Sequence, residues 1–232
     1  MSTVEALKEA MIAAGRILVD EEQGDLIFGH VTARLPDDPG LFLMKPHTIG
    51  LEEMTPDNII TCNVEGEKVM GAMPRHLEVF IHSEILRVRP DVRAVVHTHA
   101  PHAVAFSALG RPIQPVGHEG SIFCNALPVF SETSDLIVDQ PRGKAVAKAL
   151  GEHDYLMLQN HGIVTCGRTV EEATVLALYL EKACKMQLLV EACGGAKRLS
   201  TPEDATAKRG RILPQYAQVF KYLTRRCMHS HD

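Results

Sequence analysis

Hydrophobic positions recur at helical spacing in the N-terminal segment. Between Val4 and Glu21 apolar residues fall every three or four positions, which predicts an amphipathic helix, and Gly24 then ends it. Thr169, followed by Glu172, has the pattern of a capping box and opens the longest predicted helix. The helix that begins at Thr169 is predicted to extend to Ala192 (Thr169–Ala192). The other predicted helices are Arg75–Arg89, Pro101–Leu109, Pro141–Leu150 and Leu213–Arg225.

Short β-rich segments lie between these helices. Unbroken apolar character predicts a buried strand at Ala94–His97, and two further strands flank the tripeptide Asn160-His161-Gly162. The region from Gly110 to Asp139 is expected to contain loops and short strands. The other predicted strands are His30–Leu35, Leu41–Met44, Ile59–Val64, Tyr155–Leu158 and Ile163–Thr165. Because strands and helices interleave without a repeat or linker, we expect one α/β domain over residues 1–232, three-layered around a central sheet.

Composition narrows the classes of function. The 232 residues carry a net charge of −5, and the longest basic run is Arg225-Arg226, which argues against a nucleic-acid partner. No apolar stretch approaches the length of a membrane span, and the N-terminal charges do not fit a signal peptide. The six cysteines form no CxxC pair. A soluble cytoplasmic protein with reduced thiols and no membrane association is therefore expected.

The chain contains 12 histidines, and three of them suggest a metal site. His97 and His99 lie two residues apart at the end of a predicted strand, so their side chains point to the same side. His161 lies in a turn between two predicted strands. Three imidazoles around one ion, with a position left open for substrate, form a recurring catalytic arrangement. On these residues alone, a metal site and a set of surface or turn histidines remain equally open.

A possible acid or base is Glu78, which precedes His82 by four residues on the predicted Arg75–Arg89 helix. Positions four apart share a helix face. A carboxylate that is partly desolvated beside a metal can transfer protons. Taken alone, Glu78 and His82 fit an ordinary pair of surface residues on a helix better than a catalytic pair.

The whole pattern resembles the class II aldolase/adducin family, and most closely its branch of metal-dependent decarboxylases that act on hydroxylated aromatic dicarboxylates. The similarity extends from the first helix to the helix after Thr169. Four runs carry the similarity, namely Gly29–Arg34, Lys45–Gly50, Arg89–His99 and Leu158–Gly162.

The resemblance implies a three-layer α/β/α fold with a central, mainly antiparallel β-sheet, assembled as a homotetramer with active sites at subunit interfaces. It implies that His97, His99 and His161 bind one divalent metal ion per subunit, which could be Zn, Mn, Fe or Co. Glu78 matches the acidic residue of the family that serves as acid or base and sometimes contacts the metal. The shared chemistry is Lewis-acid stabilisation of an enolate-like anion.

Departures from the sugar-phosphate members of the family bear on the substrate. The small hydroxyl-bearing residues that bind phosphate in those members are absent here. Larger or cationic side chains occupy the corresponding places, and such groups suit carboxylates. The predicted substrate-binding residues are His30, Lys45, His47, Arg75 and His76. His118, in the run Gly117–Ser121, is a second candidate acid beside Glu78.

These observations favour decarboxylation of a hydroxylated aromatic carboxylate or dicarboxylate, a small-molecule substrate. An aldolase that cleaves a non-phosphorylated hydroxy-carbonyl compound would use the same metal ligands and Glu78. A non-enzymatic adducin-like interaction domain is a third possibility. We expect such a domain to have lost ligand histidines, and this chain retains all three.

Overall fold

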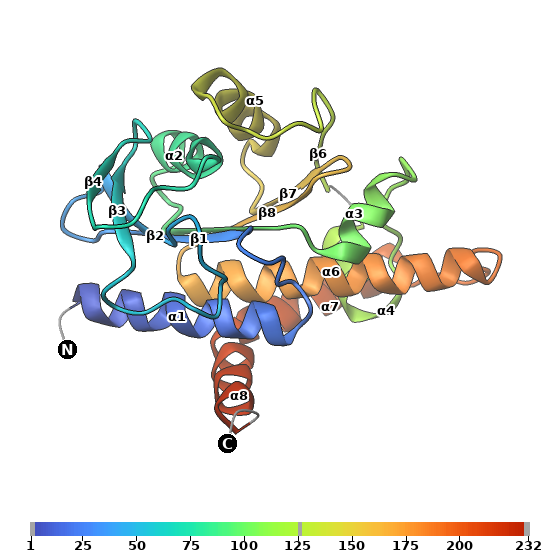
Figure 1. Cartoon of the computed structure of the whole chain (residues 1–232). Coiled ribbons are helices and arrows are strands. Elements are labelled where there is room, and N and C mark those ends of the chain that lie inside the picture. The colour runs from blue at the N-terminus through green and yellow to red at the C-terminus, as the bar shows by residue number, and fades with distance from the viewer. Residues whose placement is uncertain (1–2, 125–126, 230–232) are drawn as a thin grey trace.

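The computed structural model describes residues 3–124 and 127–229, with helices packed on both faces of an eight-stranded sheet (Figure 1). The strand order is β4-β3-β2-β1-β5-β8-β7-β6. Neighbouring strands are antiparallel except β6 and β7, which are parallel. This arrangement confirms the expected three-layer fold with a mainly antiparallel sheet. The strands are β1 (His30–Arg34), β2 (Leu41–Met44), β3 (Ile60–Asn63), β4 (Lys68–Met70), β5 (Ala94–Thr98), β6 (Val129–Phe130), β7 (Tyr155–Leu158) and β8 (Gly162–Gly167).

Each face of the sheet has its own hydrophobic core. On one face, α1 (Thr3–Asp20) and α6 (Val170–Ala192) lie beneath the strands, as Figure 1 shows. On the other, α2 (Val79–Val88) and α5 (Gln140–Leu150) cover residues such as Phe42. The central strands are buried on both faces because helices cover both. This explains why β5 begins with the apolar run Ala94–Val96 and β8 contains the apolar pair Ile163-Val164.

The remaining helices flank the α6 layer. They are α3 (Pro101–Ser107), α4 (Gly117–Phe123), α7 (Pro202–Ile212) and α8 (Tyr216–His229), with the short 3-10 helix η1 (Leu213–Gln215) before α8. Thr169 caps α6 by accepting a hydrogen bond from the Glu172 backbone N–H, as the sequence pattern predicted. Among the described residues, no helix is sufficiently long and apolar to cross a membrane.

Two predictions of local structure were wrong. Gly117–Phe123 is helical rather than loop or strand, and it is stabilised by packing on α6 and α7. The helix predicted from Arg75 begins only at Val79. Glu78 therefore occupies the N-cap position, and its carboxylate accepts a hydrogen bond from the Ile137 backbone N–H of a distant segment.

One edge of the sheet brings three segments together. β1 begins, β5 ends and β8 begins at this edge, and the Cα atoms of His30 and His97 are paired across β1 and β5. Gly162 allows the turn before β8 to lie against β5, since a Cβ atom there would come within 2.4 Å of the Thr98 carbonyl oxygen. Only glycine fits such a close backbone approach.

Candidate metal centre and active site

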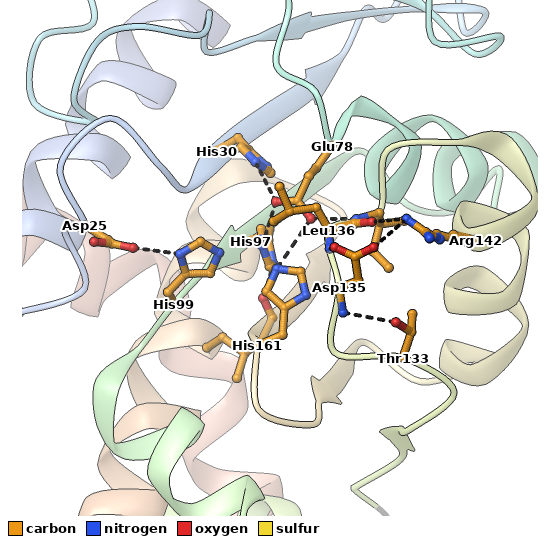
Figure 2. A network of polar contacts seen from close by, with 12 residues as sticks. Asp25, His30, Glu78, His97, His99, Thr133, Asp135, Leu136, Arg142 and His161 are labelled. Carbon is orange, nitrogen blue, oxygen red and sulfur yellow. Dashed lines mark hydrogen bonds and ion pairs between the residues drawn. The ribbon is translucent and has the colours of Figure 1, made fainter.

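The three predicted ligand histidines converge on Glu78 at this edge of the sheet (Figure 2). One potential ligand atom from each of the four side chains lies within 4.8 Å of the others. His97 comes from β5, and His99 follows it. His161 is in the β7–β8 turn, where Asn160 adopts a positive φ of 57°. Glu78 comes from the start of α2, so the site combines segments that are far apart in the sequence.

Hydrogen bonds orient two of the imidazoles toward the centre. His97 donates from Nδ1 to the Ile163 carbonyl oxygen at 2.9 Å, and His99 donates from Nδ1 to the Asp25 carboxylate at 2.7 Å. In both rings this leaves the Nε2 lone pair free. Among the described residues neither Nε2 atom has a hydrogen-bond partner, although both are buried. Unpartnered buried nitrogen atoms are costly unless something binds them. The residues present therefore fit a metal ion.

Glu78 supplies negative charge to the same centre. Its Oε1 atom is 3.4 Å from His161 Nε2, and its Oε2 atom is 3.8 Å from His97 Nε2. Burial alone would raise the pKa of this carboxyl group. The neighbouring imidazoles of His161 and His97, together with the Ile137 backbone N–H, hold the pKa well below its ordinary value. Glu78 is therefore a carboxylate in the free site and can contact a cation there.

A second group of polar side chains adjoins the first. His30, His76 and Glu78 also place potential ligand atoms within 4.8 Å of one another, and all three are buried. The rings of His30 and His76 lie 3.8 Å apart between centroids. Burial, with the nearby charge of Lys45, lowers the pKa of His76 to about 3, so this imidazole is neutral. His30 and His76 thus lie beside the candidate metal ligands, and their role in substrate binding stays a prediction.

The other predicted substrate-binding residues lie at different depths. Lys45 is buried, and its ammonium group donates to the Ile27 carbonyl oxygen at 2.8 Å. His47 is half-buried, with its ring 5.0 Å from that of His76. Arg75 is also half-buried and turns toward the Phe80 ring, while donating a hydrogen bond to the His76 carbonyl oxygen.

His118 is not brought into this group. It is exposed at the start of α4, which packs against α6 and α7. Within the described part of one chain, no contact joins it to Glu78 or to the three ligand histidines. Its proposed role as a proton donor stays a prediction.

Asp25 is a residue that the sequence did not identify. It lies in a tight loop where Leu26 has a positive φ of 50°, and it approaches His99 only because that loop folds over the end of β5. An isolated acidic residue in an irregular loop has no recognisable pattern. Its carboxylate fixes the tautomer of His99, and a carboxylate behind a histidine is a recurrent arrangement around bound metals.

Asp25→Asn should weaken metal binding by about 10- to 100-fold, because an amide holds the His99 tautomer less firmly than a carboxylate. Competition with a chelator of known affinity would measure the effect. Asp57→Asn, at an exposed aspartate, is the matched control. Equal affinity in both variants would show that Asp25 does not support the ligand.

Comparison with known proteins agrees with this geometry. Residues 9–188 match the family described as Class II Aldolase and Adducin N-terminal domain. The chain belongs to this family, whose class II aldolases use a divalent metal ion. This confirms the resemblance inferred from the four sequence runs.

Individual relatives and solved structures carry different names. Decarboxylase NovR of Streptomyces niveus is 32% identical over 191 residues, which is 82% of this chain and 70% of that protein. The meiotically up-regulated gene 14 protein of Schizosaccharomyces pombe is 34% identical over 78% of this chain and 71% of its own length. The solved structure of L-fuculose 1-phosphate aldolase from Glaciozyma antarctica PI12 aligns with a TM-score of 0.82 and 30% identity, covering 96% of this chain and 93% of that one.

Proposed function

We propose that this protein is a metal-dependent carbon–carbon lyase that decarboxylates a hydroxylated aromatic carboxylate or dicarboxylate. The observation that carries the proposal is the pair of adjoining groups around Glu78, with three metal ligands on one side and His30, His76 and Lys45 on the other. The similarity to a relative named as a decarboxylase supports the choice of reaction. We further propose a homotetramer with interfacial sites and one Zn, Mn, Fe or Co ion per subunit.

His97, His99 and His161 would hold the metal ion, with Glu78 beside them. When bound, the ion would supply Lewis-acid stabilisation of the anion that forms on the substrate. Neutral imidazole ligands do not cancel the charge of a divalent ion and one carboxylate cancels only part of it, so negative charge on a substrate oxygen would be favoured there.

The protein's own residues would bind the substrate carboxylate and transfer the proton. Lys45 and His76 would bind a carboxylate, and His47 and Arg75 lie farther out for a second one. The Glu78 carboxylate would take the proton of a ring hydroxyl group. The bond between the ring and the departing carboxylate then breaks, carbon dioxide leaves, and its electron pair remains on the ring carbon. Glu78 returns its proton to that carbon, which restores the carboxylate.

Carbon dioxide release from a panel of hydroxylated aromatic dicarboxylates tests the proposal, with protein stripped of metal and then reloaded. Metal-dependent release from one member would support it. A panel without release, together with metal-dependent formation of an aldehyde from a hydroxy-carbonyl compound, would replace it by the aldolase function. The structural similarity to L-fuculose 1-phosphate aldolase makes that the second candidate.

Lys45 gives the proposed function a pH dependence. Burial lowers the pKa of its ammonium group to about 8, although Glu52 and Glu53 partly oppose the shift. The charged form therefore dominates at pH 7 and is lost as the pH rises through about 8. We expect KM for a carboxylate substrate to rise up to about tenfold per pH unit above that point.

Steady-state kinetics between pH 6.5 and about 9.5 would measure this rise. Lys45→Met removes the titrating group, so its KM should be high at every pH and lack the step near 8. A wild-type KM that stays flat through this range, or a Lys45→Met variant that keeps the step, would rule Lys45 out as the carboxylate ligand.

A further inference from the structure

The adjoining group His30, His76 and Glu78 could in principle bind either a second cation or an anion, because neutral imidazoles and a carboxylate are also metal ligands. What His30 can bind depends on which of its ring nitrogens carries the hydrogen. If His30 Nε2 bears a lone pair, it can bind a metal ion. If it bears a hydrogen, it can only donate a hydrogen bond to an anion.

A buried chain of hydrogen bonds determines that tautomer. His30 Nδ1 lies 2.8 Å from His82 Nε2, and His82 Nδ1 lies 2.9 Å from the Thr32 hydroxyl oxygen. All three side chains have an exposed fraction of 0%. Each ring nitrogen in the chain faces one partner. The acceptor to which the Thr32 hydroxyl group donates therefore sets the direction of both bonds, the one between Thr32 and His82 and the one between His82 and His30.

The Thr32 hydroxyl group has two possible acceptors. His82 Nδ1 is at 2.9 Å, whereas the Val95 carbonyl oxygen is at 3.4 Å, beyond the usual length of such a bond. Val95 lies in β5 between β1 and β8, so the strand ladder can satisfy its carbonyl group without Thr32. The shorter contact favours donation from the hydroxyl group to His82; His82 then donates from Nε2 to His30, which places the His30 hydrogen on Nε2.

The His30 Nε2 atom faces the active site. It is 3.9 Å from Glu78 Oε2 and is buried without a hydrogen-bond partner among the described residues. Both ring nitrogens of His76 are also buried there without partners. The Lys45 ammonium group adds positive charge close to both rings. A donor N–H and a cation favour an oxyanion at this place and disfavour a second metal ion.

We propose that Thr32 and His82 are positioning residues that hold His30 as a hydrogen-bond donor, so that this group binds a carboxylate or phenolate oxygen of the substrate and not a second metal ion. The assignment of the donor and of an anion site stands on the structure of the free protein. The identity of the oxyanion as part of a hydroxylated aromatic carboxylate rests on the proposed function.

Metal stoichiometry tests the exclusion of a second ion. Stripped protein reloaded with Zn²⁺ or Mn²⁺ should contain one ion per chain by elemental analysis, and His76→Ala should leave that number unchanged. Two ions per chain in the wild type, with one lost in His76→Ala, would overturn the proposal. This outcome does not depend on whether the protein is a decarboxylase or an aldolase.

The tautomer can be observed directly in the free wild-type protein by neutron crystallography or by ring ¹⁵N NMR. We expect hydrogen on Nε2 of His30 and of His82, and none on Nδ1 of either ring. Hydrogen on Nδ1 of both rings would mean that the chain runs in the opposite direction and that His30 presents a lone pair, which would overturn the proposal.

Thr32→Val tests the function of the chain, since valine keeps the shape and removes only the hydroxyl group. KM for the substrate should rise about tenfold, the cost of one buried hydrogen bond, with metal content unchanged. Thr32→Ser should restore most of the affinity. Thr174→Val is the matched control, because its buried hydroxyl bonds only to its own helix at the Val170 carbonyl. Equal KM values for Thr32→Val and Thr174→Val would contradict the role of Thr32.

Discussion

Replacing His97 by alanine is expected to remove bound metal and nearly all activity, with a fall of at least about 10³-fold in kcat/KM. His97 is fully buried in β5, and its ring is oriented by the Ile163 carbonyl oxygen. We therefore expect kcat to fall as well as the affinity for substrate. Elemental analysis after reloading and the rate of carbon dioxide release would measure the two effects.

His153→Ala is the matched control for this experiment. His153 is half-buried in the turn two residues before β7, and its contact with Arg89 uses the backbone carbonyl oxygen, which the substitution leaves in place. Circular dichroism would check that His97→Ala is folded. A folded His97→Ala variant that kept full activity without metal would refute both the ligand assignment and the metal-dependent mechanism.

Glu78→Gln is expected to lower kcat by about 10²- to 10⁴-fold, the usual contribution of a general acid or base. Glutamine has the same length, and its amide oxygen can still accept the Ile137 N–H, so the local fold should persist. The three histidines would remain to bind metal. The expected signature is therefore a large loss in kcat with a smaller loss of metal than in His97→Ala.

Glu84→Gln provides a control within the same helix, since Glu84 is equally buried but pairs with Arg87 away from the histidines. Its kcat should stay within about twofold of wild type. Stopped-flow measurement of a single turnover would separate chemistry from product release. If Glu78→Gln retained a kcat close to that of Glu84→Gln, proton transfer would have to be assigned to another group, such as His118.

Together, the two variants distinguish metal binding from proton transfer without assuming which substrate is used. Decarboxylation and aldol cleavage both require the ligand histidines and Glu78. Under the proposed function, the residues that would separate the two reactions lie in the adjoining group, which contains His30 and His76 with Lys45 close by. Experiments on that group are therefore the ones that would identify the substrate.

The elements of the fold were largely predictable because their hydrophobic patterns are local. The central strands are buried on both faces and contain apolar runs, while Thr169 and Glu172 mark the beginning of α6. Gly117–Phe123 was missed because its helix is short and depends on packing against α6 and α7. The beginning of α2 was also misplaced. The residues before Val79 are compatible with a helix, but Glu78 bonds to the distant Ile137 N–H and takes the N-cap position instead.

The sequence by itself determined which residues are the candidate ligands, because His97, His99 and His161 occur at predicted strand ends where side chains can converge and the whole pattern resembles a metal-binding family. Only the tertiary structure decided what surrounds them. Asp25 reaches His99 through a loop, and Thr32 reaches His82 across the packing of α2 on the sheet. Such contacts depend on distances between segments that have no common sequence pattern. Tautomers, burial and neighbouring charge are set by these contacts, and so the direction of hydrogen bonding at His30 becomes visible only in the folded chain.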